Sequence, residues 1–365
     1  MTDSTDCVVV GTGVVGLACA RAMAGKGYEV VLLEKNASFG EETSSRNSEV
    51  IHGGIYYPTE SLKANLCLRG KSMLYDYCLE RSIPFNRCGK LIVATSEDEL
   101  QRLTSIRELA LANGVYLHQL NSREVVAMEP EVSAVAGLYS ETTGIIDSHA
   151  LLISLLADID GLGGVVAYNT KVQEIASSDQ KIRVSAMDGE LLCTWLINCA
   201  GLEAPNLASM ITGDAAPRRF SHGRYFSYSG PSPFSRLVYP VPEKGGLGIH
   251  FTMDLAAQGK FGPDVHWKDK VDYTFPDDEK LRLRFLEAIE KYYPRVESDR
   301  LSPAYIGVRP KISDSDKKPD DFLIEGPAVH GVAGLINLLG IESPGLTASL
   351  AIGKYVSDLV TASSY

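Results

Sequence analysis

The chain has 365 residues, of which 45% are hydrophobic and 22% charged, and its formal net charge is −11 at pH 7. This composition is typical of a soluble globular protein with enough chain for two or three domains. The acidic balance argues against nucleic acid or an anionic membrane as a partner, so an anionic substrate would need a local group of basic residues.

Seven cysteines are scattered through the chain, with no C-x-x-C pair and no metal-ligand spacing. Several lie in apolar runs, so we expect buried free thiols, no metal site and a reducing intracellular compartment such as the cytoplasm. No basic segment with an apolar core precedes the first predicted strand, so a secretory signal is not expected. No apolar run reaches the ~20 residues that span a membrane, so no transmembrane segment is predicted.

The start of the chain has the pattern of a dinucleotide-binding site. A β-branched run at residues 6–10 breaks into G-x-G-x-x-G at Gly11, Gly13 and Gly16, and a helical pattern follows to Met23. Gly11 permits a tight turn, Gly13 lets the backbone approach a pyrophosphate, and Gly16 allows the helix to pack closely on the strand. The N-terminus of the helix supplies free N–H groups for the phosphates.

A second predicted strand, residues 29–33, ends in Glu34-Lys35. Glu34 has the ~20-residue spacing of the acid that holds a ribose 2′-hydroxyl, and it would repel a phosphate at that position. We therefore expect a ligand whose adenosine ribose has a free 2′-hydroxyl and lies against Glu34 and Lys35. Val14 and Val15, at the start of the helix, are also expected to contact this ligand. The alternative is a glycine-rich turn without a ligand, and this stretch does not separate NAD from FAD.

A polar segment follows at residues 40–48, and it includes Thr43, Ser44, Ser45, Arg46 and Asn47. Hydroxyls, an arginine and an asparagine so close together suit a second phosphate-binding segment. The alternative is a solvated loop that caps a helix. Because the segment leads into His-Gly-Gly-Ile-Tyr-Tyr, which a surface loop seldom needs, the binding interpretation is favoured.

The rest of the chain alternates helical and strand patterns. Helices are predicted at residues 61–79, 98–112, 149–159, 277–292 and 345–359. Strands are predicted at residues 90–95, 115–118, 135–139, 165–169, 170–176, 182–186, 191–198, 218–229, 236–241, 247–252, 303–310, 322–324 and 334–339. The strands between residues 165 and 198 suggest a three-stranded meander that returns to the nucleotide sheet and ends in small residues, where a ligand can approach closely.

Elements of the nucleotide sheet occur at both ends and in the middle of the chain, so we predict two domains interleaved in sequence. The predicted class is α/β (α+β): a Rossmann-like domain with a central parallel sheet, and a substrate domain with an antiparallel sheet. The first comprises residues 1–80, 145–215 and 330–365, and the second comprises residues 81–144 and 216–329.

These residues together resemble the FAD-dependent oxidoreductases of the D-amino-acid-oxidase and glycerol-3-phosphate-dehydrogenase group, and within it the L-2-hydroxyglutarate dehydrogenases. The matching segments are residues 11–16, 34–35, 45–48, 51–57, 61–64, 88–94, 239–242, 248–252, 307–309 and 343–344. The chain departs from the family at residues 222–225 and looks shortened within 255–330, which bears on the substrate more than on the cofactor.

The resemblance implies noncovalently bound FAD, hydride transfer from a substrate C–H bond to flavin N5, and a middle sheet that roofs the flavin. The glycine break before the last helix supports FAD independently, because the positive end of that helix could face the flavin N1–C2=O edge. Further expected cofactor contacts are Val172, Ala200, Gly201, Gly340, Glu342, Ser343, Pro344, Gly345, Leu346 and Thr347.

His52 and Arg309 are the sharpest candidates for chemistry. Oxidation of a 2-hydroxy acid removes the hydroxyl proton as the α-hydrogen leaves, and an imidazole with a pKa near 6.5 could accept that proton. Arg309 could clamp a carboxylate by two hydrogen bonds. The alternative for His52 is a structural histidine, either hydrogen-bonded in the core or fixing the flavin ring. The alternative for Arg309 is a surface ion pair.

The predicted roof sheet carries the remaining candidates. A dicarboxylate needs a second cationic or donor group, which Arg224, His250 or Lys260 could supply, and His250 is also a catalytic candidate. Tyr225 and Tyr239 on these strands, and Tyr57 after His52, are expected substrate contacts, although strand tyrosines often serve only in packing.

The sequence therefore predicts oxidation of a small 2-hydroxy acid, with L-2-hydroxyglutarate converted to 2-oxoglutarate as the favoured reaction. One alternative is an amine or amino-acid oxidase of the same fold, which needs one carboxylate anchor and no base. The other is a flavin-binding protein without turnover. The electron acceptor (oxygen, a quinone or a flavoprotein) and the oligomeric state are left open.

Overall fold

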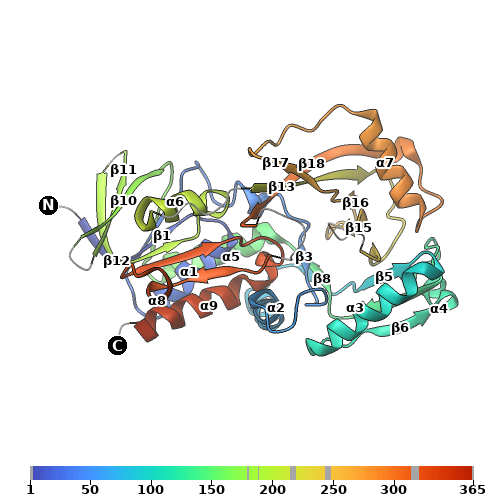
Figure 1. The fold of residues 1–365 in the computed structure, drawn as a ribbon, viewed down its shortest axis with the longest axis horizontal. Coiled ribbons are helices and arrows are strands. Elements are labelled where there is room, and N and C mark those ends of the chain that lie inside the picture. The colour runs from blue at the N-terminus through green and yellow to red at the C-terminus, as the bar shows by residue number, and fades with distance from the viewer. Residues whose placement is uncertain are drawn as a thin grey trace.

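The computed structural model describes residues 3–178, 181–187, 189–213, 219–242, 248–313 and 320–363. Two large sheets lie toward opposite ends of the long axis (Figure 1), and a small third sheet joins β3 (Val50–Ile51), β8 (Gly144–Ile146) and β4 (Phe85–Asn86). Residues 218 and 247, at the ends of two predicted strands, lie outside the described residues.

The first sheet combines a parallel core with an antiparallel meander. Its order is β10 (Val172–Ser178), β11 (Lys181–Ala186), β12 (Gly189–Asn198), β1 (Asp3–Val10), β2 (Val30–Leu33) and β9 (Val165–Ala167), with β20 (Leu335–Leu339) beside β12 and β19 (Leu323–Glu325) beside β20. The strands β12, β1, β2 and β9 pair in parallel, whereas β10–β11–β12 is antiparallel. The predicted meander and its return to the nucleotide sheet are confirmed.

The unbroken apolar run of β1 reflects burial on both faces, as in other parallel sheets. Val9 packs in the cluster that contains residues of α1 (Val14–Ala24), α5 (Ser148–Gly161) and α9 (Gly345–Ser363). Val8 and Val10 pack on the opposite side, against the meander and α6 (Ala204–Thr212). The first sheet is thus covered on both faces. The turn after β1 emerges at the carboxyl end of its parallel strands.

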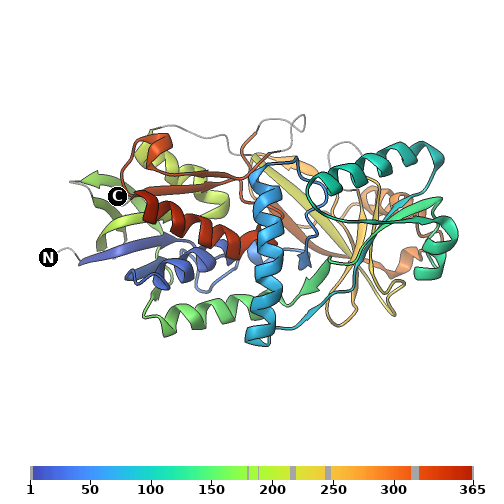
Figure 2. The ribbon, with the colours of Figure 1, turned by 90° about the horizontal axis from the view of Figure 1, so that it is seen from below.

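The helix α2 (Leu62–Arg81) stands across the middle of the molecule, between the two large sheets (Figure 2). Its first N–H groups are capped by Ser61 and by Asp321, which accepts from Leu62 and Lys63 at 2.8 Å each. A Cβ on Gly70 of α2 would collide with the Thr347 carbonyl oxygen of α9. The two helices therefore lie against each other where α9 begins.

The second sheet is mainly antiparallel. Its order is β17 (His266–Lys268), β13 (Arg219–Tyr228), β16 (Gly259–Gly262), β15 (His250–Met253), β14 (Leu237–Pro240), β5 (Lys90–Ala94), β7 (Ala136–Ser140) and β6 (His118–Asn121), with β18 (Leu301–Lys311) along β13. Only β14 and β5 pair in parallel among its described strand pairs. The helices α7 (Glu279–Glu290) and α3 (Leu100–Ala112) belong to separate core clusters of this sheet.

The predicted fold class is confirmed, with local differences. The strand predicted at residues 115–118 forms later, as β6, because Val115 and Leu117 fill a core as loop residues. The prediction omitted α8 (Pro327–His330) and the short strands β16 and β17, and it omitted α4 (Ser122–Met128), although the Asn121–Glu124 capping box marks the start of α4.

All seven cysteines are free thiols, and five of them are buried. Over the described ranges, no helix has the length and apolar character needed to cross a membrane.

Candidate active site

A long pocket begins at the turn after β1 and ends against the second sheet. It is lined by most of the residues predicted to bind cofactor or substrate: Gly11, Gly13, Val14, Val15, Gly16, Glu34, Lys35, Thr43, Ser44, Arg46, Asn47, His52, Val172, Ala200, Gly201, Tyr225, Tyr239, His250, Arg309, Glu342, Ser343, Pro344, Gly345 and Leu346. The predicted residues outside this lining are Ser45, Tyr57, Arg224, Lys260, Gly340 and Thr347.

Glycines at the start of the pocket leave room that side chains would fill. Gly11 has a φ of +99°, and a Cβ there would lie 2.6 Å from the Cys199 carbonyl oxygen. A Cβ on Gly16 would collide with the Gly11 carbonyl oxygen, and one on Gly13 would lie 3.1 Å from Ser44 Oγ. The strand, the helix and the polar segment therefore meet closely enough that only glycine fits at Gly11 and Gly16.

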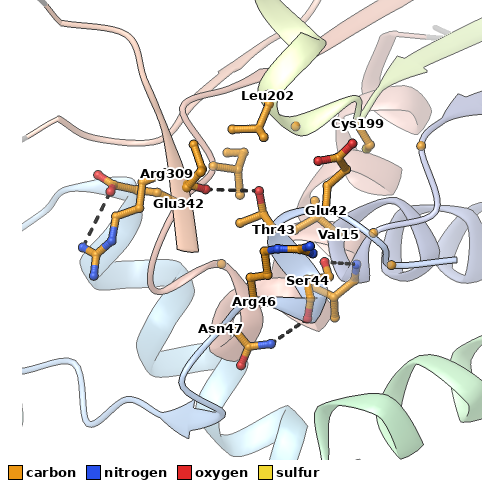
Figure 3. Close-up of a pocket in the computed structure, with 18 of the residues that line it drawn as sticks. Val15, Glu42, Thr43, Ser44, Arg46, Asn47, Cys199, Leu202, Arg309 and Glu342 are labelled. Carbon is orange, nitrogen blue, oxygen red and sulfur yellow. Dashed lines mark hydrogen bonds and ion pairs between the residues drawn. The ribbon is translucent and has the colours of Figure 1, made fainter. Parts of the chain in front are cut away.

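The polar segment at residues 43–47 folds back over the N-terminus of α1 (Figure 3). The Val14 N–H donates to Ser44 Oγ at 3.0 Å, and Asn47 Nδ2 donates to the Ser44 carbonyl at 2.6 Å. Ser44 lies in the short helix η1 (Thr43–Ser45), where Thr43 Oγ1 donates to the Val308 carbonyl of β18 at 3.3 Å. The segment thus connects a helix N-terminus, which favours anions, to the second sheet.

Glu34 is a buried carboxylate fixed by three donors. It accepts from the Thr12 N–H at 2.9 Å, the Thr12 hydroxyl at 2.7 Å and the Asn36 N–H at 2.9 Å. An ionised carboxylate has about four acceptor sites, so capacity remains for a ribose hydroxyl. Lys35, which was expected beside the ribose, forms an ion pair with Glu42, and its Nζ lies 2.9 Å from Glu42 Oε1.

His52 follows β3 and meets the start of α9. Its ring Nε2 lies 3.0 Å from Ser343 Oγ, and its backbone N–H donates to Thr347 Oγ1 at 2.9 Å. Thr347 is therefore a support for His52 although it does not line the pocket. The first N–H groups of α9 have no partners within the helix, and its first residues Gly345 and Leu346 line the pocket, so the positive end of this helix faces the ligand space.

The environment of His52 favours the neutral imidazole. Burial, followed by the positive charges of Lys90 and Arg309 and by His250, lowers the pKa of His52 to about 3. The pKa of His250 also falls to about 3, chiefly through burial. The expectation of a pKa near 6.5 is thus wrong for His52, because sequence does not reveal how completely a histidine is enclosed.

Arg309 and Glu342 form one wall of the pocket (Figure 3). Arg309 Nη1 lies 3.9 Å from Glu342 Oε2, and 37% of the Arg309 side chain is exposed. Because Arg309 lines the pocket, this exposed surface is directed into it. Arg309 is therefore available to an anionic ligand.

Glu342 lies at the centre of a cluster of cations. Its Oε1 lies 2.9 Å from Lys63 Nζ and 2.7 Å from Lys311 Nζ. Burial raises the pKa of Glu342, but Lys63, Lys311 and Arg309 outweigh burial and lower it, so the carboxylate is ionised. Glu342 Oε2 has no hydrogen-bond partner within the described part of the chain, which leaves a buried acceptor beside the pocket.

Aromatic rings and His250 form the far end of the pocket. Tyr239 stacks on His250 with ring centroids 3.7 Å apart, and Tyr225 stacks on Tyr305 at 4.6 Å. Tyr225 also interacts with Arg309: burial raises the pKa of Tyr225, and the positive charge of Arg309 lowers it against this larger effect. Tyr57 lies just outside the lining and contacts Ser343.

Two predicted cations have other partners. Arg224 is paired with Asp264, which accepts from its Nε at 2.9 Å and from its Nη2. Lys260 Nζ lies 5.7 Å from the centre of the Tyr305 ring. Neither side chain lines the pocket.

Sequence reasoning missed three lysines and a threonine around the site. Lys63 and Lys311 neutralise Glu342, Lys90 lies close behind His52, and Thr12 orients Glu34. Lys63 and Lys90 lie in segments that resemble the family. Lys90 also begins an apolar strand, and a lysine in that position indicates a buried cation.

The donor set fits FAD. The pocket offers a glycine cradle and a helix N-terminus for a pyrophosphate, an acid with spare acceptor capacity for a ribose, and a second helix N-terminus at the far end. Across the described residues, no group of three or more histidines, cysteines, aspartates or glutamates could hold a metal ion.

A family profile described as FAD dependent oxidoreductase, DAO, matches residues 6–359. The mitochondrial L-2-hydroxyglutarate dehydrogenase of Arabidopsis thaliana is 40% identical over 98% of this chain and 83% of its own length. A dithionite-reduced L-α-glycerophosphate oxidase from Mycoplasma pneumoniae with FAD bound superposes with a TM-score of 0.90 at 25% identity, over 99% of this chain and 95% of that one. Glycine oxidase from Geobacillus kaustophilus shares the fold, with a TM-score of 0.83 at 19% identity over 99% and 95% of the two chains. This chain belongs to the DAO family of FAD-dependent oxidoreductases, and it is an FAD-dependent oxidoreductase.

Proposed function

We propose that this protein oxidises a small 2-hydroxy acid, with L-2-hydroxyglutarate as the substrate and 2-oxoglutarate as the product. One observation carries the proposal: a neutral histidine, His52, and an open guanidinium, Arg309, belong to the same end of one pocket. The similarity to a plant L-2-hydroxyglutarate dehydrogenase supports the choice of substrate.

FAD bound in the pocket supplies the hydride acceptor. Residues 11–16, Glu34 and residues 43–47 would hold its adenosine and pyrophosphate, and residues 341–346 would lie beside its isoalloxazine ring. Residues 1–80, 145–215 and 330–365 would then form the FAD-binding domain, and residues 81–144 and 216–329 the substrate-binding domain.

The free thiols are consistent with a reducing compartment.

Arg309 holds the carboxylate next to the reacting carbon. Its planar guanidinium offers parallel donors to a carboxylate, and Glu342 and Tyr225 lie beside it. Tyr225, Tyr239 and His250 enclose the substrate and exclude water from the far end of the pocket.

His52 accepts the hydroxyl proton while the α-hydrogen leaves as hydride. Its ring is held by Ser343 at Nε2, and its backbone is held by Thr347. The low pKa of His52 keeps the imidazole unprotonated at neutral pH, which is the form that can accept a proton.

Anaerobic titration of the purified FAD-bound protein tests the proposal. We expect L-2-hydroxyglutarate to bleach the oxidised flavin absorbance, while glycine and a panel of L- and D-amino acids leave it unchanged. Bleaching by an amino acid instead would identify an amino-acid oxidase, whose fold this chain shares. Absence of bleaching with every compound would indicate a flavin-binding protein without turnover.

Glu34→Gln should weaken FAD binding by about tenfold or more. The amide keeps the size of the side chain, but it loses the charge that accepts both Thr12 donors and the ribose hydroxyl. The dissociation constant is measured by adding FAD to the apoprotein and following flavin fluorescence. Glu174→Gln, which changes an exposed carboxylate on β10, is the matched control, and equal affinities in the two variants would remove Glu34 from the ribose site.

His52→Gln should lower kcat by roughly 10²–10⁴ with little change in KM, because the amide keeps a hydrogen bond but cannot act as the base. Since the pKa of His52 is about 3, the unmodified enzyme should lose activity through His52 protonation only as the pH falls toward that value. We therefore expect no limb from His52 between about pH 5 and pH 9. If the variant keeps the kcat of the unmodified enzyme, His250 becomes the candidate base.

Arg309→Lys should lower kcat/KM by about ten- to a hundredfold, since loss of one charge-assisted hydrogen bond costs roughly 1.5–3 kcal/mol. The loss should fall mainly on KM if the carboxylate is held equally in the ground and transition states. Steady-state kinetics with L-2-hydroxyglutarate give both constants. Arg282→Lys, on the surface of α7, is the control, and a KM equal to that control would contradict the carboxylate clamp.

A further inference from the structure

Lys90 is a fully buried cation directly behind the far end of the pocket. It begins β5, it is 1% exposed, and its Nζ lies 4.7 Å from the centre of the Tyr56 ring and 4.6 Å from the centre of the Tyr239 ring. Tyr239 lines the pocket and stacks on His250. One tyrosine ring therefore contacts both the Lys90 ammonium and the histidine at the end of the pocket.

Within the described ranges, no carboxylate forms an ion pair with Lys90. The faces of aromatic rings attract a cation, but they do not neutralise it as a carboxylate does. A buried charge without a counter-ion is costly, and this cost is recovered if an anion arrives nearby. The pocket end lined by Tyr239 and His250 is the space next to Lys90 that a ligand can enter.

The proposed substrate has two carboxylates, and Arg309 accounts for one of them. Of the other predicted cations, Arg224 is paired with Asp264 and Lys260 lies against Tyr305. The Glu342 cluster contains Arg309 itself, so it lies on the same side as the first carboxylate. A second positive centre is thus provided by Lys90.

Building on the proposed function, we propose that Lys90 selects for the second carboxylate of a dianionic substrate. Its ammonium, held between Tyr56 and Tyr239, attracts that carboxylate across the wall formed by Tyr239 and His250. Lys90 is a positioning residue in this proposal, because its side chain does not line the pocket. A monoanionic 2-hydroxy acid would gain nothing from it.

Lys90 also changes charge in an accessible pH range. Burial lowers the pKa of Lys90 to about 7. Its titratable neighbours stay uncharged near that pH: the pKa values of His52 and His250 are about 3, that of Cys67 is about 12, and burial raises those of Tyr56 and Tyr239. Raising the pH through 7 thus removes the Lys90 charge and leaves these neighbours unchanged.

The first test compares L-2-hydroxyglutarate with its 5-amide, which has the same shape but lacks the second charge. In the unmodified holoenzyme, we expect kcat/KM to favour the dianion by about tenfold or more. Lys90→Met should abolish most of this preference, whereas Lys260→Met should keep it. A preference that persists in Lys90→Met, or disappears in Lys260→Met, would overturn the inference.

The second test uses the unmodified holoenzyme, so it does not depend on whether Lys90→Met folds. Glutarate and butyrate, which cannot be oxidised at a hydroxyl group, are titrated against the oxidised flavin absorbance at several pH values. Glutarate should bind about tenfold more weakly as the pH is raised through about 7, because Lys90 loses its charge, while butyrate binding stays constant. Identical pH dependence for the two acids would overturn the inference.

These outcomes separate the inference from the function on which it rests. If L-2-hydroxyglutarate does not reduce the flavin, the proposed function fails. If it does reduce the flavin, and Lys90→Met still prefers the dianion, only the role of Lys90 fails.

Discussion

The close contact of the last helix with two earlier helices is the constraint on which the site depends. Gly70 of α2 and Gly353 of α9 lie where a Cβ would collide with the backbone of a neighbouring helix, at Thr347 and Ala18 respectively. Glycine at these points lets α9 lie directly between α1 and α2. The first turn of α9 is thereby fixed against the chain after β3, and this contact brings Ser343 and Thr347 to His52.

Although the protein is acidic, positive charge gathers at one end of the pocket. Lys63, Lys311 and Arg309 surround the single carboxylate of Glu342, and Lys90 lies behind His52 without a carboxylate partner among the residues whose placement is described. The net charge of −11 therefore says little about the field at the site. Positive potential in an enclosed space raises the local concentration of anions and keeps nearby imidazoles neutral.

Sequence reasoning succeeded where function depends on local backbone geometry. The order of strand, glycine turn, helix, strand and Glu34 predicted the start of the pocket, since those residues are neighbours in the chain as well as in space. It failed where function depends on enclosure. Lys90, Arg309 and His250 lower the pKa of His52, but they are distant from it in the sequence. The pKa of His52 could therefore not be predicted. The pairing of Arg224 with Asp264 was hidden for the same reason.

The separation of each sheet into distant segments has a consequence for synthesis. On a ribosome, β1 emerges first, but its neighbour β12 follows nearly 190 residues later, and β20 joins β12 only near the end of the chain. The start of α9, which supports His52, is made later still. Because non-local pairing must wait for both partners, the nascent chain holds an incomplete sheet through most of translation. An mRNA with a stop codon shortly before residue 335 would therefore yield a chain that lacks β20. It would also lack Ser343 and Thr347, which hold His52.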